Sequence, residues 1–230
     1  MKKIGMIGGV GPESTVDYYK MLVSTYRERV RDDSYPLILI NSVDLTRMVK
    51  FLNAGDLAGL ADVLSAEIQG LINAGAEIGL LSSNTPHIVF DELARRSSIP
   101  LVSIVEATAD VAVTKGFRKL GLLGSRYTMQ GTFFQNVFAR RGMEIFVPNP
   151  EEQNWIHEHY MGELVKGLFL PATRDEFLAI IEKLRERHGI EALILGGTEL
   201  PLLLRDVKAS VPFLDTARIH VDAVMNRALE

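Results

Sequence analysis

Short apolar runs alternate with longer amphipathic stretches along this chain. Most runs hold four or five nearly continuous apolar residues and end in Gly, Ser, Asn or Asp, which is typical of strands buried on both faces of a parallel sheet. Helical periodicity lies between them, as in residues 57–74 and 174–187. Alternating β and α elements predict an α/β fold with right-handed crossovers. The apolar runs are 4–7, 37–40, 78–81, 101–105, 120–123, 145–147, 192–195 and 213–214.

The chain also contains an internal repeat. Three matches occur in the same order, and their shifts drift by only two residues from one to the next, which favours two related halves. We therefore predict two similar doubly wound lobes related by pseudo-symmetry, lobe 1 from residues 1–103 plus 212–230 and lobe 2 from 104–211. Ligands bind beyond the carboxyl ends of such strands, so we expect an active-site cleft between the lobes. The matches are 3–8 with 119–124, 75–81 with 189–195 and 98–101 with 210–213.

Two polar turns follow equivalent strands of the two halves. They are residues 82–87 (SSNTPH) and 196–201 (GGTELP). Free backbone N–H groups at a helix start attract anions, and a carboxylate suits them. Helix capping alone would explain one such turn, but two in equivalent places make a ligand site an equally good interpretation. The repeat sets Ser83 opposite Gly197, Asn84 opposite Thr198 and Thr85 opposite Glu199.

The first strand ends in a glycine-rich turn, residues 8–15 (GGVGPEST), which is an imperfect dinucleotide fingerprint. Ser14 stands where the third glycine belongs, and Pro12 removes an N–H that a phosphate would use. The second strand ends in Asn41 instead of the expected acid. A structural turn is therefore favoured over nucleotide binding.

Other polar candidates lie beyond the predicted strands. Arg47 follows the second strand, where a guanidinium could clamp a carboxylate. The first turn of the second half, residues 124–129 (GSRYTM), is rich in hydroxyls and includes Thr128. Lys166 lies near a helix end, and its position alone favours a cation placed at a helix C-terminus.

Composition excludes several classes of function. The 230 residues are 47% hydrophobic and 23% charged, as in a globular protein and not a disordered chain. The net charge is −4 without a basic stripe, so we expect no nucleic-acid partner. No run approaches the roughly 20 apolar residues of a membrane span, and the opening glycines interrupt any signal segment, so we expect no membrane association and a cytoplasmic location. Without cysteine, and with scattered histidines, we expect no metal site.

The polar turns carry a resemblance to the PLP-independent aspartate/glutamate racemase family. That resemblance implies a two-lobed α/β enzyme, usually a homodimer, acting on a small carboxylated amino acid without cofactor or metal. It implies that Asn84, Thr85, Thr198 and Glu199 contact the substrate, with Thr128 beside them. Arg47 and Lys166 would hold its carboxylates. The matching motifs are 4–9 (IGMIGG), 11–15 (GPEST) with Tyr18 and Tyr19, 83–87 (SNTPH), 122–124 (LLG) with 127–129 (YTM), and 197–200 (GTEL).

This chain departs from the family at the two catalytic positions. Family racemases typically carry a cysteine in each matched turn, one on either face of the α-carbon, whereas here Ser83 and Gly197 take those places. A thiol pKa can be lowered to the working pH, but a serine hydroxyl needs a neighbouring base, and glycine has no side chain. Racemisation by two bases at these positions is therefore not expected.

Three interpretations remain. In the first, Ser83, assisted by Glu199 or Lys166, acts on one face of a small carboxylated substrate, and open space at Gly197 admits a larger group or a water. Deprotonation, elimination or decarboxylation would each need only one such group. In the second, the protein is a catalytically silent binding or sensor protein for a dicarboxylic amino acid. A third, deliberate replacement of the cysteines, is disfavoured by Gly197, because paired Ser or Ala would be the natural choice.

Overall fold

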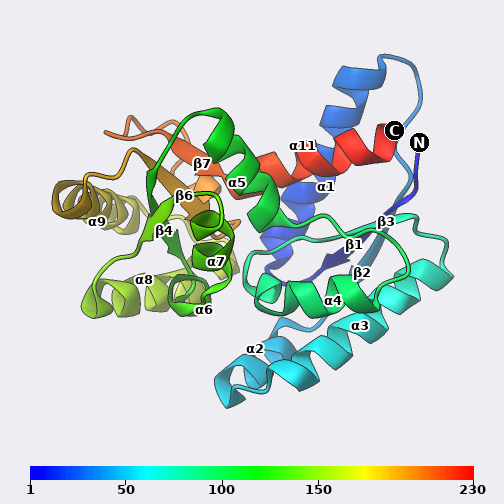
Figure 1. Cartoon of the computed structure of the whole chain (residues 1–230), viewed down its shortest axis with the longest axis horizontal. Helices are drawn as coiled ribbons and strands as arrows, with labels where there is room; N and C mark the ends of the chain where they lie inside the picture. The colour runs from blue at the N-terminus through cyan, green and yellow to red at the C-terminus, as the bar shows by residue number, and fades with distance from the viewer. The chain divides into compact units, whose positions relative to one another are not determined.

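A computed structural model describes all residues, 1–230 (Figure 1). Its seven strands form two separate parallel sheets, and the predicted α/β fold is thereby confirmed. The strands are β1 (Ile4–Gly8), β2 (Ile38–Ser42), β3 (Ile78–Leu81), β4 (Lys119–Gly124), β5 (Glu144–Phe146), β6 (Ala192–Gly196) and β7 (Phe213–Asp215). The helices are α1 (Pro12–Val30), α2 (Leu45–Ala54), α3 (Leu57–Asn73), α4 (Phe90–Arg96), α5 (Ile104–Thr114), α6 (Arg126–Gln130), α7 (Phe133–Ala139), α8 (Pro150–Gly162), α9 (Pro171–His188), α10 (Leu200–Leu203) and α11 (Thr216–Leu229), with 3₁₀ helices η1 (Thr85–Val89) and η2 (Leu164–Lys166).

The internal repeat is present in the sheets. The strand order is β2-β1-β3 in the first sheet and β5-β4-β6-β7 in the second. The registers correspond as well, because Ile4 pairs with Ile78 in the first sheet and Leu120 pairs with Ala192 in the second. These pairs lie at the shifts that the sequence repeat shows. The prediction of two similar lobes is therefore confirmed.

The strand expected at 101–105 is wrong as a full strand. Only an isolated bridge forms there, between Gly79 and Leu101, and α5 begins three residues later. The chain leaves the sheet because the N–H of Ile104 is donated to the His87 ring, 3.1 Å away, instead of to a sheet carbonyl. The equivalent segment of the second sheet does form a strand, β7.

The chain divides into two compact units, and each is described by itself. Unit 1 comprises Met1–Ile104 and Ala217–Glu230, and unit 2 comprises Val105–Thr216. The second boundary falls later than the one drawn at residue 212 from the sequence. The reason is hydrogen bonding, because β7 pairs in parallel with β6, and this keeps residues up to Thr216 with the second sheet.

Each unit has its own core. In unit 1, α1 and α11 pack on β1 and β3 through buried side chains such as Tyr18, Leu22, Val221 and Val224. In unit 2, side chains of α8, α9 and α10 pack on β4 and β6. None of the helices is long and apolar enough to cross a membrane.

Candidate ligand-binding residues

The first set of candidate residues lies at the carboxyl edge of the sheet in unit 1. Ser83, Asn84 and Thr85 follow β3, and Arg47 lies in the first turn of α2, just after β2. Because β2, β1 and β3 are parallel neighbours, these segments leave the same edge of the sheet. Asn84 is buried and Ser83 is half-buried, whereas Arg47 is exposed and forms no ion pair.

His87 fixes the backbone of the turn that carries Ser83. The N–H of Ile104 donates to its Nε2, so Nε2 carries no proton and Nδ1–H donates to the Ser83 carbonyl, 2.9 Å away. Both ring nitrogens are thus used by the backbone, and His87 is not free to activate the Ser83 hydroxyl. That hydroxyl forms no hydrogen bond of its own within unit 1. His87 is therefore a structural histidine of this turn.

A second buried histidine lies beside the first. The His220 ring lies 5.9 Å from the His87 ring, donates through Nε2 to the Val102 carbonyl and accepts from the Tyr18 hydroxyl at Nδ1. Burial, together with the charge of His220, lowers the pKa of His87 to about 3. Burial also lowers the pKa of His220 to about 4, so both rings are neutral at pH 7.

The glycine-rich turn of unit 1 is built as a structural turn. The N–H of Gly9, which a phosphate cradle would need, donates to Thr15 Oγ1 at 2.8 Å. Gly9 has a φ of 81°, and a Cβ there would overlap the Val43 carbonyl oxygen. The turn is therefore packed against the end of β2 by its own backbone.

The second set of candidate residues lies in unit 2, after β6. Gly197, Thr198 and Glu199 form the turn between β6 and α10, and the latter two are almost fully buried. Thr128 in α6 lies against this turn, because its methyl group would be 3.1 Å from a Cβ on Gly196. The structure thus brings Thr128 to the turn. Lys166 is exposed in η2, with no ion pair, and no contact in unit 2 brings it to Glu199.

The space at Gly197 is filled, which corrects the expectation of open space there. A Cβ on Gly197 would stand 2.5 Å from Cε2 and 2.6 Å from Oη of Tyr160, a residue of α8. Real Cβ atoms do not approach other atoms this closely, so neither a larger group nor a water occupies this position. Tyr160 is not among the residues predicted from the sequence. Its spacing from Gln153 and Ile156 indicates a buried helix face, but the sequence of the helix does not indicate which residues this face contacts.

Tyr160 and Glu199 form a buried pair. The Tyr160 hydroxyl donates a short hydrogen bond to Glu199 Oε2, and the Thr198 hydroxyl donates to the same oxygen at 3.3 Å. Burial, followed by the negative charge of Glu199, raises the pKa of the Tyr160 phenol well above its usual value. The phenol therefore stays protonated at pH 7 and acts as a hydrogen-bond donor, not as a base.

The start of α8 is held in two ways, and this places Tyr160. Asn149 and Glu152 form a reciprocal capping box, with the Asn149 side chain accepting from the Glu152 N–H at 2.9 Å. Arg187 of α9 also binds both carboxylate oxygens of Glu152, at 2.8 and 2.6 Å. Tyr160 follows on the same rigid helix.

Loss of the cap should be measurable. We expect Asn149→Ala to lower the free energy of unfolding by about 1 kcal/mol, because the N–H of Glu152 loses its acceptor. Urea denaturation monitored by circular dichroism measures the change. Asn154→Ala is the matched control, since Asn154 is exposed in the interior of the same helix and its loss should change stability by less than about 0.5 kcal/mol. Equal losses in the two variants would contradict the role of the cap.

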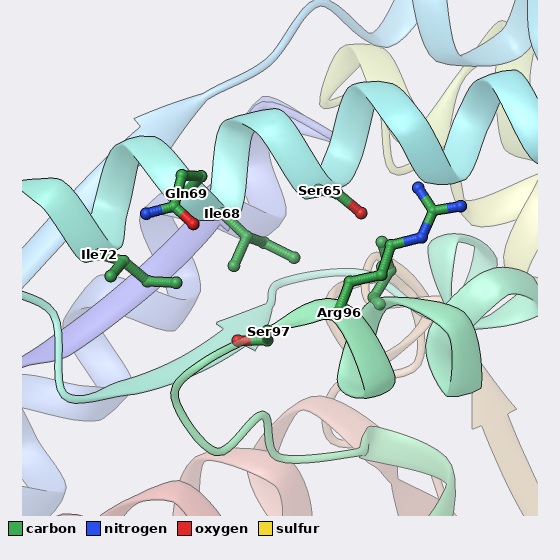
Figure 2. Close-up of a pocket in the computed structure, with 7 residues that line it drawn as sticks. Ser65, Ile68, Gln69, Ile72, Arg96 and Ser97 are labelled. Atoms are coloured by element: carbon green, nitrogen blue, oxygen red, sulfur yellow. The ribbon is translucent and has the colours of Figure 1, made fainter.

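Two surface pockets lie in unit 1. The one between α3 and α4 is lined by Arg96 and Ser97 among others and contains none of the predicted residues (Figure 2). The Arg96 guanidinium is already paired with Asp62 and Glu92. The other, between α2 and α3, is lined by Arg47 together with Asp44, Glu67 and apolar side chains. Only the second pocket thus offers a free cation. No group of three His, Asp or Glu side chains is arranged to hold a metal ion.

Comparison with known proteins gives one consistent result. A family model described as Asp/Glu/Hydantoin racemase matches residues 7–224. An aspartate racemase homologue from Pyrococcus horikoshii OT3 is 38% identical, with full coverage of both chains and a TM-score of 0.85. A candidate Asp/Glu racemase from Yersinia pestis is 33% identical, again with full coverage and a TM-score of 0.90. The broad specificity amino-acid racemase RacX of Bacillus subtilis is 23% identical over 93% of this chain and 92% of that protein.

Proposed function

We propose that this chain, which belongs to the Asp/Glu/Hydantoin racemase family, binds a small carboxylated amino acid without inverting its α-carbon through two thiols. The observation that carries the proposal is that, in a chain without cysteine, the Tyr160 ring fills the space into which a side chain on residue 197 would project. Inversion needs a base and an acid on opposite faces of the α-carbon, each within about 3 Å of it. A neutral phenol tied to Glu199 does not supply the base.

The proposed binding residues follow from their chemistry. Arg47 and Lys166 are exposed cations without ion pairs, as carboxylate-binding side chains require. Short polar side chains at the two strand ends, Asn84, Thr85, Thr128, Thr198 and Glu199, would bind the remaining polar atoms of the ligand. No cofactor is part of the proposal. The homodimer expected from the family resemblance and the cytoplasmic location expected from the hydropathy of the chain belong to the same proposal.

A second candidate function is one-sided chemistry at Ser83. The observation that favours it is the half-buried Ser83 hydroxyl, which forms no hydrogen bond within unit 1 and stands at a strand end. Because His87 is committed to the backbone, an assisting base would have to come from Glu199 or Lys166. Exchange or elimination on a single face would then be possible.

Proton NMR in D₂O distinguishes the two candidates. The protein is incubated with L- or D-aspartate and L- or D-glutamate, and binding is followed separately by calorimetry. We expect binding of at least one of the four without loss of its α-proton signal. Loss of the signal with retained configuration, abolished by Ser83→Ala, would support the second candidate. Inversion would contradict both, and the absence of binding would refute these ligands.

Arg47 provides a sharper test of the binding proposal. We expect Arg47→Ala to weaken the affinity for the bound amino acid about tenfold or more, because a charge-assisted hydrogen bond to a carboxylate is worth about 1.5–3 kcal/mol. Lys50→Ala is the matched control, since it removes the same charge from the same helix outside the Arg47 pocket. Isothermal titration calorimetry compares the three proteins. A similar affinity in both variants would exclude Arg47 from the binding residues.

A further inference from the structure

Position 197 is the repeat counterpart of Ser83. The space beside Gly197 is not left open by the absence of a side chain, because another residue fills it. The three atoms nearest to a Cβ on Gly197 all belong to Tyr160, at 2.5, 2.6 and 2.8 Å. The hydroxyl is one of them. The volume into which a side chain on residue 197 would project is therefore occupied by the phenol end of Tyr160.

The phenol is held at this place from two sides. Its hydroxyl donates to Glu199, two residues after Gly197, and its ring packs in the core of unit 2 with Ile156 and Leu164. Only 7% of Tyr160 and 2% of Glu199 is exposed. A side chain on residue 197 could not displace the ring without breaking the hydrogen bond to a buried carboxylate.

We propose that Tyr160 takes the place of a side chain at position 197 and closes this half of the site to acid–base chemistry. Gly197 and Tyr160 are then coupled: residue 197 must be glycine because any Cβ there would overlap the Tyr160 ring. This inference rests on the proposed function, since it explains how a racemase-family protein binds a ligand without acting on its second face.

The packing part is tested by thermal denaturation, which needs neither ligand nor activity. We expect Gly197→Ala to lower the melting temperature by about 4 °C or more when Tyr160 is present, because the added methyl group overlaps the ring. In the Tyr160→Ala background the same substitution should have no such effect, since the methyl enters vacated space. Tyr160→Phe is the matched control: it keeps Cε2, so the loss from Gly197→Ala should persist. If Gly197→Ala changes the melting temperature by the same amount with and without Tyr160, the proposal is overturned.

The functional part is tested by restoring both thiols. Ser83→Cys combined with Gly197→Cys should give little inversion of aspartate or glutamate in the presence of Tyr160. Adding Tyr160→Ala to the pair should raise the inversion rate at least about tenfold, since a positioned acid or base contributes about 10²–10⁴-fold. Phe177→Ala, which loosens the same core from α9, should give no such gain.

The outcomes separate this inference from the proposed function. If the triple variant binds the amino acids but inverts them no faster than the double variant, Tyr160 is not what closes this face. If no protein in the series, including the unaltered chain, binds any of the four amino acids, the proposed function fails. The melting temperatures then still decide whether Tyr160 and Gly197 are coupled.

Discussion

Lowering the pH from 7 to 5 is expected to reduce the free energy of unfolding by about 4 kcal/mol through two histidines. His87 and His220 have pKa values of about 3 and about 4 in the folded protein, against 6.5 as the ordinary value. Between these limits the unfolded chain takes up protons that the native chain does not. The stabilisation is therefore nearly complete above pH 6.5 and is lost as the pH falls toward the folded pKa values of about 4 for His220 and about 3 for His87. Each ring accounts for about 2 kcal/mol of the reduction in the free energy of unfolding at pH 5.

Urea denaturation at several pH values between 5 and 8 measures this dependence above the range in which most carboxylates titrate. We expect a flat profile from pH 7 to 8 and a fall with a slope of about two protons near pH 5. Replacing one ring, as in His220→Gln, lowers stability at every pH because the bonds to Tyr18 and Val102 change, but it should roughly halve the slope. A profile equally stable at pH 5 and pH 7 would show that these rings are not buried as neutral groups.

Among the residues of the glycine-rich turn, Gly9 is the one whose substitution is expected to lower the free energy of unfolding most. We expect Gly9→Ala to lower the free energy of unfolding by about 3 kcal/mol or more. A φ of 81° costs an L-residue about 1–2 kcal/mol. In addition, its Cβ would overlap the backbone carbonyl of Val43, which cannot rotate away, and overpacking of this kind typically costs about 1–3 kcal/mol.

Gly55 provides the matched control for this prediction. It lies in the same unit with a φ of 66°, but no atom lies within 4 Å of its added Cβ. Gly55→Ala should therefore show only the cost of the backbone conformation, about 1–2 kcal/mol. Chemical denaturation of the two variants separates strain from steric overlap. Equal losses would mean that the turn shifts to accommodate a side chain, and the close packing of Gly9 against the end of β2 would be refuted.

The functional consequence of these two regions is the same. The glycine-rich turn and the pair of histidines each fix backbone at the carboxyl edge of the first sheet, where Ser83 and Asn84 lie. Neither region supplies a base. In unit 2, the space into which a side chain on residue 197 would project is filled by the Tyr160 ring.

The sequence by itself determined the fold class, the repeat and the polar turns. Strands that are buried on both faces of a parallel sheet are nearly continuous in apolar residues. This local pattern is the same whichever elements pack on the strand, so it can be recognised in the sequence. The repeat then predicted equivalent strands, and the paired registers of β1 with β3 and β4 with β6 agree with it. The same alignment set Ser83 opposite Gly197, and the family resemblance implied that these are the positions at which family racemases carry cysteine.

Only the tertiary structure decided how those positions are surrounded. The segment at 101–105 reads as a strand because it is apolar, yet a hydrogen bond from Ile104 to His87 ends it after one bridge. Likewise, a glycine in the sequence suggests open space where a side chain would otherwise lie, as was expected at Gly197. Whether that space is open depends on a side chain from a different helix, here Tyr160, and periodicity along one element reports burial without naming the partner. Contacts between residues distant in sequence are set by packing, and packing decided that the space at position 197 is filled.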